Sequence, residues 1–66
     1  MDIGKSIKIA LIKKGENQKW LGEQLGHNTP QNTSHLVNSK TTKQATIERL
    51  AEIFEMPVSE FIALGE

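Results

Sequence analysis

The sequence has no cysteine, no tyrosine, one tryptophan and two prolines among its 66 residues. The absence of cysteine excludes disulfide bonds and thiolate metal ligands, so the hydrophobic core alone must stabilise the fold. No apolar run approaches the roughly 18 residues that a membrane-spanning helix needs. The first residues, MDIGKSIKIALIKKG, also lack the order of basic, apolar and small-residue segments that marks a signal peptide. We therefore expect a cytoplasmic protein.

Neither sign of charge is in excess, because eight basic and eight acidic residues cancel. Their distribution is nevertheless uneven. Residues 1–43 carry a net charge of +4 from seven lysines and three acidic residues, and residues 44–66 carry −4 from Arg49 and five glutamates. Such a division lets one part of the surface attract a polyanion while another part stays acidic. A chain of 66 residues suffices for one small domain, which we place at residues 1–66.

Apolar residues recur at intervals of three and four positions rather than two, which predicts an all-α fold, a compact bundle of five short helices. Asp2 and Asn17 are suited to begin the first two helices, each of which a glycine then ends. Thr29 followed by Pro30 is typical of the start of a third helix. The expected helices cover residues 2–14, 18–25, 30 to about 38, about 44 to 55, and one or two turns after Pro57. The residues expected to face the core are Ile3, Ile7, Ala10, Leu11, Leu21, Leu25, Thr33, Leu36, Val37, Ile47, Leu50, Ala51 and Phe54, with Ile9 and Ile12 widening the face of the first helix and Trp20 at the core edge.

Catalysis needs titratable groups of different roles that converge on one site. The sequence offers His27, His35, Asp2 and seven glutamates, five of them in the last third of the chain, and it has no glycine-rich phosphate loop. The two histidines have no acidic neighbour placed as a third ligand, so a metal site is not expected. We predict that the protein is not an enzyme and has no catalytic residue, metal, cofactor or small-molecule ligand.

The third helix has an outer face of amides, hydroxyls and imidazole, with no formal charge from Pro30 to Ser39. The residues that share this face at helical spacing are Gln31, Ser34, His35 and Asn38. Amide side chains pair with adenine, Ser and His donate single hydrogen bonds to base edges, and an α-helix fits the major groove, about 12 Å wide. Groups suited to binding phosphate flank the helix: Asn17 and Gln18 before it, and Lys40, Thr41, Thr42 and Lys43 after it. The alternative is a polar helix face that binds no ligand. Because the polar face and the basic flanking residues occur together, a nucleic-acid ligand is favoured.

Two segments resemble a known family. Residues 17–26 (NQKWLGEQLG) and 29–41 (TPQNTSHLVNSKT) resemble the helix-turn-helix of lambdoid phage repressors and Cro proteins, which bacterial regulators of the XRE type share. Residues 47–54 (IERLAEIF) and 58–62 (VSEFI) are similar to the fourth and fifth helices of that family. The resemblance implies a lambda repressor-like DNA-binding domain with its helix-turn-helix at about residues 17–39. It also implies a location at the nucleoid of a bacterium or a phage-infected host cell.

The resemblance also implies roles for single residues. Gln18 would bind a phosphate at the start of the second helix, and Gln31 and His35 would read bases. The residues available at the flanks of the reading positions are Asn32 and Ser34. The residues that match the backbone-contacting turn of the family are Asn38, Lys40, Thr41 and Lys43.

The chain departs from the family pattern at several points. The link over residues 26–29 looks one residue longer than usual, which would shift the reading helix along the groove. Pro30 replaces a residue that often reads a base, so one base contact should be missing. Gly22 stands where alanine is common, which predicts close packing of the two helices. Thr33 takes a core position that is usually aliphatic, and we expect its hydroxyl to bond back to helix carbonyls.

A further departure concerns a buried ion pair that family members often hold between the first and third helices. Alignment of the motifs puts Leu11 and Val37 at the two positions, so both partners are apolar here. Replacing a whole buried ion pair by packed apolar residues is often neutral or stabilising. We therefore predict that the two side chains touch, within about 4.5 Å.

The leading expectation is sequence-specific binding to double-stranded DNA as a small Cro-like transcriptional repressor, with the third helix in the major groove. Such domains usually bind palindromic operators as dimers, with half-sites about 34–36 Å apart. No segment follows the fifth helix to hold a separate sensing domain, which favours a Cro-like protein. The apolar C-terminal residues either form a weak homodimer interface or complete the monomer core: Met56, Val58, Phe61, Ile62 and Leu64. Two other functions stay open, an antitoxin-like module that binds a protein through the acidic C-terminal half, and a structural or assembly factor.

Overall fold

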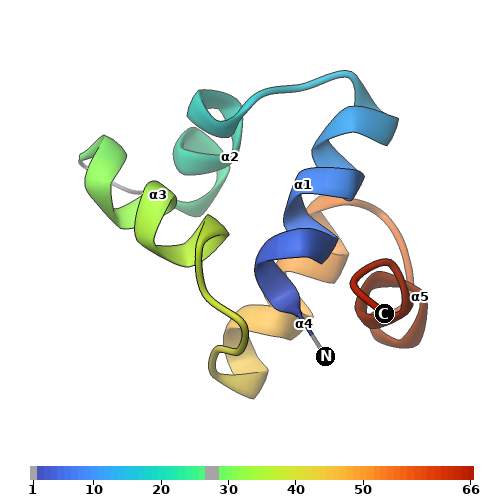
Figure 1. Ribbon diagram of the computed structural model, residues 1–66. Helices are drawn as coiled ribbons and strands as arrows, with labels where there is room; N and C mark the ends of the chain where they lie inside the picture. The colour runs from blue at the N-terminus through green and yellow to red at the C-terminus, as the bar shows by residue number, and fades with distance from the viewer. Residues whose placement is uncertain (1, 27–28) are drawn as a thin grey trace.

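The computed structural model describes residues 2–26 and 29–66, except for the side chain of Pro30. The described residues form five helices (Figure 1): α1 (Ile3–Lys14), α2 (Gln18–Leu25), α3 (Pro30–Val37), α4 (Gln44–Ile53) and α5 (Val58–Ala63). The predicted all-α class is confirmed, and the helix bounds agree with those predicted to within two residues. Within the described ranges, no helix has the length and apolar character that crossing a membrane requires.

The first two helices begin at capping side chains and end at glycines, as predicted. The Asp2 carboxylate accepts a hydrogen bond from the Lys5 amide at 3.0 Å, and the Asn17 side chain accepts one from the Trp20 amide at 2.9 Å. Gly15 and Gly26 follow the two helices with φ of 76° and 74°. This left-handed conformation favours glycine, so these two residues define where α1 and α2 stop.

The start of α3 and the end of α4 depend on backbone geometry rather than on side-chain caps or glycine. Thr29 occupies the predicted N-cap position of α3, but its side chain makes no capping hydrogen bond. The fourth helix stops at Ile53, two residues before the predicted end, because Glu55 has a φ of 57°. The amides of Glu55 and Met56 then donate to carbonyls of the last helical turn. A glutamate in a conformation usually held by glycine gave no sequence signal for this end.

The core lies around α1, which packs against α3 on one side and α5 on the other (Figure 1). Its buried members come from all five helices and from the residue after α4: Ile3, Ile7, Ala10, Leu11, Leu21, Val37, Ile47, Leu50, Ala51, Phe54 and Phe61. The prediction for Ile12 is wrong, because its side chain is 79% exposed. Nine positions after Ile3, at about 100° a residue, it points about 180° away from the core face.

The N-terminus of α1 contacts two segments that are distant in the sequence, the link after α3 and the C-terminus. The amides of Ile3 and Gly4 donate to the Lys40 and Ser39 carbonyls, both at 2.8 Å. The backbone there is so close that a Cβ on Gly4 would overlap the Val37 carbonyl oxygen. On the other side, a Cβ on Gly65 would overlap the Asp2 carbonyl oxygen, so the two ends of the chain lie together (Figure 1).

Three aromatic rings link α2, α4 and α5. Trp20 lies 6.0 Å from Phe54 between ring centroids, and Phe54 lies 6.0 Å from Phe61. Trp20 is half-buried against the core, which confirms its predicted place at the core edge. The Lys14 ammonium lies 5.7 Å from the Trp20 ring centroid. The other C-terminal apolar residues are half-buried and pack on the same core: Met56, Val58, Ile62 and Leu64.

Candidate nucleic-acid interface

The candidate interface is built on the pairing of α2 with α3. Gly22 and Thr33 lie where the two helices meet: a Cβ on Gly22 would come within 2.6 Å of the Thr33 hydroxyl oxygen. Both residues are buried, with Thr33 3% exposed. The predicted close approach at Gly22 and the core position of Thr33 are therefore confirmed. The absence of a side chain at Gly22 sets how closely α3 sits on α2.

The inward face of α3 is anchored by Thr33 and Val37, and its outward face is free for contact. The residues on that outward face with exposed side chains are Gln31, Asn32, His35 and Asn38, while Ser34 is half-buried. Since helix residues three and four apart share a face, the exposed residues form one ridge along the helix. We call Gln31, Asn32, His35 and Asn38 the polar ridge. The predicted outer face differs in one member, because Ser34 is half-buried and the exposed Asn32 takes part instead, so the ridge consists of amides and one imidazole.

The last turn of α3 is closed by its own polar residues. The Asn38 side-chain amide donates to the Ser34 carbonyl at 2.9 Å, and the Ser39 hydroxyl donates to the His35 carbonyl at 2.8 Å. These bonds satisfy carbonyls that the helix end would otherwise leave unpaired. Asn38, predicted as a backbone contact to a ligand, thus also caps the helix.

The predicted phosphate-binding residues lie at both ends of this helix pair. Asn17 and Gln18 are exposed at the N-terminus of α2, where Asn17 is already engaged as the cap. Beyond α3, Lys40, Thr41 and Lys43 are exposed and Thr42 is half-buried. The hydrogen bonds from α1 to the Ser39 and Lys40 carbonyls hold the start of this second group in place.

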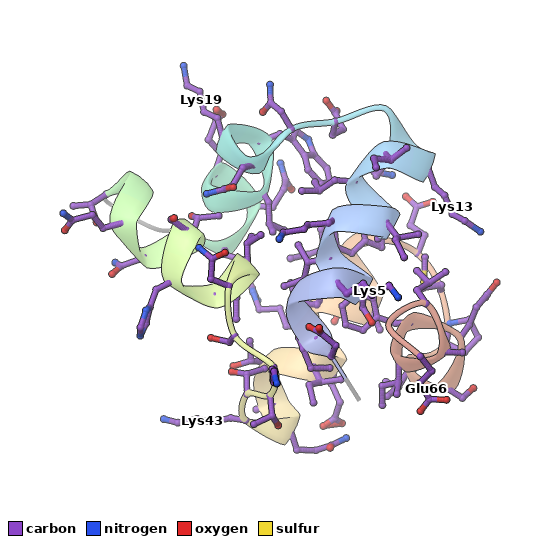
Figure 2. All side chains as sticks on the ribbon, in the orientation of Figure 1. Lys5, Lys13, Lys19, Lys43 and Glu66 are labelled. Carbon is purple, nitrogen blue, oxygen red and sulfur yellow. The ribbon has the colours of Figure 1, made fainter. Side chains whose placement is uncertain are left out.

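Figure 2 shows where the labelled charged side chains lie. Lys19 on α2 and Lys43 before α4 project from the side that carries α2 and α3, whereas Lys13 and Glu66 project from the opposite side (Figure 2). In the described part of the chain, one ion pair lies within 4.0 Å, between Lys14 and Glu55. The lysines near α3 are therefore not neutralised by neighbouring carboxylates at that distance.

Sequence reasoning missed two residues of α1 that lie beside this interface. Lys5 and Lys8 line an open groove of about 310 Å³ between the start of α1 and the end of α3. The remaining lining residues are Asp2, Val37, Asn38 and Lys40. The spacing of three between Lys5 and Lys8 places them on one face of α1, but no sequence signal tells that this face meets the end of α3.

Three further sequence expectations concern the contact of Leu11 with Val37, the length of the link and metal binding. Leu11 and Val37 are 7% and 4% exposed and belong to one buried cluster, while their direct contact stays a prediction. The longer link predicted over residues 26–29 includes residues 27 and 28, which lie outside the described residues. Among the residues that are described, no group of three or more His, Asp or Glu side chains is placed to hold a metal ion.

Comparison of the chain with protein-family models, with curated proteins and with solved structures finds no match.

Proposed function

We propose that this protein binds double-stranded DNA in a sequence-specific manner, as a small Cro-like transcriptional repressor, with α2 and α3 acting as its helix-turn-helix. The observation that carries the proposal is the polar ridge on α3. Three of its members are amides and one is an imidazole, all exposed. Amides and imidazoles hydrogen-bond to base edges in the major groove, where each base pair presents a distinct pattern.

The support of α3 favours the same function. Direct readout needs a helix whose position is set by the scaffold, because hydrogen bonds to bases depend on distance and angle. Here α3 is held along its inward face, by Thr33 against Gly22 and by Val37 in the core. Gln18 begins α2 and Lys43 precedes α4, so the flanking groups stand on both sides of α3 in the chain, and phosphates line both sides of a major groove.

The protein would repress transcription by occluding a promoter to which it is bound. Dimerisation on a palindromic operator stays part of the proposal. The C-terminal apolar residues pack at least partly on the monomer core, with Phe61 fully buried. A homodimer through them would therefore use only their remaining exposed surface and should be weak without DNA.

The experiment is selection of bound sites from a random duplex pool, followed by affinity measurements on the selected site. We expect Gln31→Ala to relax base preference at one or two positions, while Lys40→Ala weakens binding to all sequences alike and lowers the salt dependence. Lys13→Ala, on the opposite side of the molecule, is the matched control and should change neither base preference nor affinity by more than a small factor. Failure to enrich any site, or base preference that survives Gln31→Ala and His35→Ala together, would contradict the proposal. That result would favour the antitoxin-like alternative, in which the acidic C-terminal half is the interface with a protein partner.

A further inference from the structure

The groove between α1 and the end of α3 is a concentration of positive charge. Lys5 and Lys8 line it from α1 and Lys40 lines it from the link before α4. The Asp2 carboxylate also lines the groove, and one of its oxygens accepts a hydrogen bond from the Lys5 backbone amide. At neutral pH the four charged side chains therefore sum to +2. Like charges gathered in one groove repel each other, and a bound anion would relieve that repulsion.

The lysines of the groove are available for such an anion. In the parts of the chain that the structure describes, neither Lys5, Lys8 nor Lys40 has a carboxylate within 4.0 Å of its ammonium, since the ion pair found there joins Lys14 to Glu55. All three side chains are exposed. Binding an anion here therefore does not first require one of these lysines to give up an ion pair.

The walls of the groove are held together by the backbone. The first two amides of α1, at Ile3 and Gly4, donate to the Lys40 and Ser39 carbonyls. The next two, at Lys5 and Ser6, donate to the side chain and the carbonyl of Asp2. The N-terminal amides of α1 are thus already occupied, so the lysine side chains are the groups left to bind an anion here.

The groove continues the polar ridge. Asn38 belongs to both, since it lies on the exposed face of α3 and also lines the groove. When a helix lies in the major groove, the sugar–phosphate backbone runs past its ends. An anion seated beside Asn38 would therefore occupy the position that a backbone phosphate takes next to a reading helix.

We propose that the groove of Lys5, Lys8 and Lys40 binds a phosphodiester group of the same DNA whose bases α3 reads, so that α1 makes a backbone contact of its own. The proposal rests on the proposed function. The chemistry recognised is a phosphate oxyanion, and its source is the duplex backbone rather than free phosphate.

The first test compares the double variant Lys5→Gln/Lys8→Gln and the single variant Lys8→Gln with the control Lys13→Gln. Glutamine keeps helix propensity close to that of lysine. Lys13 lies on the same helix, at the end distant from α3 (Figure 2). The slope of log affinity against log salt should fall by about 0.9 for each lost phosphate contact, which is about 3.5-fold in affinity between about 50 and about 200 mM salt. The double variant should show this fall in slope, whereas Lys13→Gln should keep the wild-type slope. Base preference should be unchanged in both variants.

The second test locates the phosphate. Neutral methylphosphonate is placed at one backbone position at a time on the site selected from the random pool. At one position it should weaken binding of the wild-type protein, but have little further effect on Lys5→Gln/Lys8→Gln, while Lys13→Gln behaves as wild type. Inorganic phosphate alone, titrated to millimolar concentration, should leave the Asn38 and Lys40 amide resonances in place.

Each failure has its own meaning. If the wild type enriches no DNA site, the proposed function and this inference fall together. If it enriches a site but Lys5→Gln/Lys8→Gln and Lys13→Gln have equal salt slopes, or no methylphosphonate position couples to the double variant, α1 makes no phosphate contact and only this inference is overturned. Saturable shifts with inorganic phosphate, without coupling to any DNA position, would overturn it as well, because the groove would then be a site for the free anion.

Discussion

The contact between Gly22 and Thr33 allows a quantitative test of how α2 and α3 are held together. In an ordinary helix interior, replacing glycine by alanine stabilises by about 1 kcal/mol. At Gly22 the new Cβ would lie 2.6 Å from the Thr33 hydroxyl oxygen, whereas ordinary contacts begin at 3.4 Å. The helices or the side chain must therefore shift by several tenths of an ångström. Thr33 is only 3% exposed, so its hydroxyl has little room to turn aside in the packed interior and the helices should move.

Overpacking a core position by one methyl group costs about 1–3 kcal/mol. Set against the gain in helix propensity, Gly22→Ala should destabilise the protein by up to about 2 kcal/mol. In a Thr33→Ala background the hydroxyl is gone and the nearest remaining atom, the Cβ of residue 33, lies at an ordinary 3.7 Å. There the same substitution should stabilise by about 0.5–1 kcal/mol. The predicted coupling energy between the two positions is therefore about 1–3 kcal/mol.

The assay is a double-mutant cycle of the wild type, the two single variants and the double variant. Unfolding in urea is followed by far-UV circular dichroism and by the fluorescence of Trp20, the single tryptophan, which is half-buried in the folded state. A small protein has an m-value of about 1–3 kcal/mol/M in urea, so 1 kcal/mol shifts the unfolding midpoint by about 0.3–1 M and the sign of each step is measurable. The reasoning is refuted if Gly22→Ala has the same effect in both backgrounds, or if it stabilises the wild type.

Three further predictions concern stability. Gly4→Ala should cost about 1–3 kcal/mol in urea unfolding, because its Cβ would meet the Val37 backbone carbonyl, which no side-chain substitution can remove. A neutral effect would show that α1 and α3 separate easily. Glu55→Gly should raise Tm by several degrees, since a left-handed conformation costs a non-glycine residue about 1–2 kcal/mol and the exposed pair with Lys14 contributes little; a lower Tm would disprove that account. Phe61→Ala should remove about 3–5 kcal/mol and with it the cooperative thermal transition, whereas Ile12→Ala, at an exposed position, should stay within about 0.5 kcal/mol of wild type. Comparable losses for these last two variants would contradict the assignment of the core.

The candidate site was predictable in its local parts and less so in its assembly. The polar face of α3 was predicted from residue spacing, because positions three and four apart share a face in any α-helix. The four exposed members of the polar ridge are among the residues named from the sequence. The groove of Lys5, Lys8 and Lys40 was not foreseen. One side of the groove is the start of α1, and the other is the end of α3 with the link that follows it. The two sides meet through the hydrogen bonds that the Ile3 and Gly4 amides donate.

The sequence by itself determined where most helices begin and end and which residues face inward. Capping by Asp2 and Asn17, termination at Gly15 and Gly26, and apolar spacing are local properties that act within one or two turns. Tertiary structure alone decided the rest. Glu55 ended α4 early without a glycine to signal it, and α1 came to lie against the end of α3. These outcomes depend on which helix faces meet, and that follows from long-range packing and close backbone approach, which periodicity along one helix does not encode.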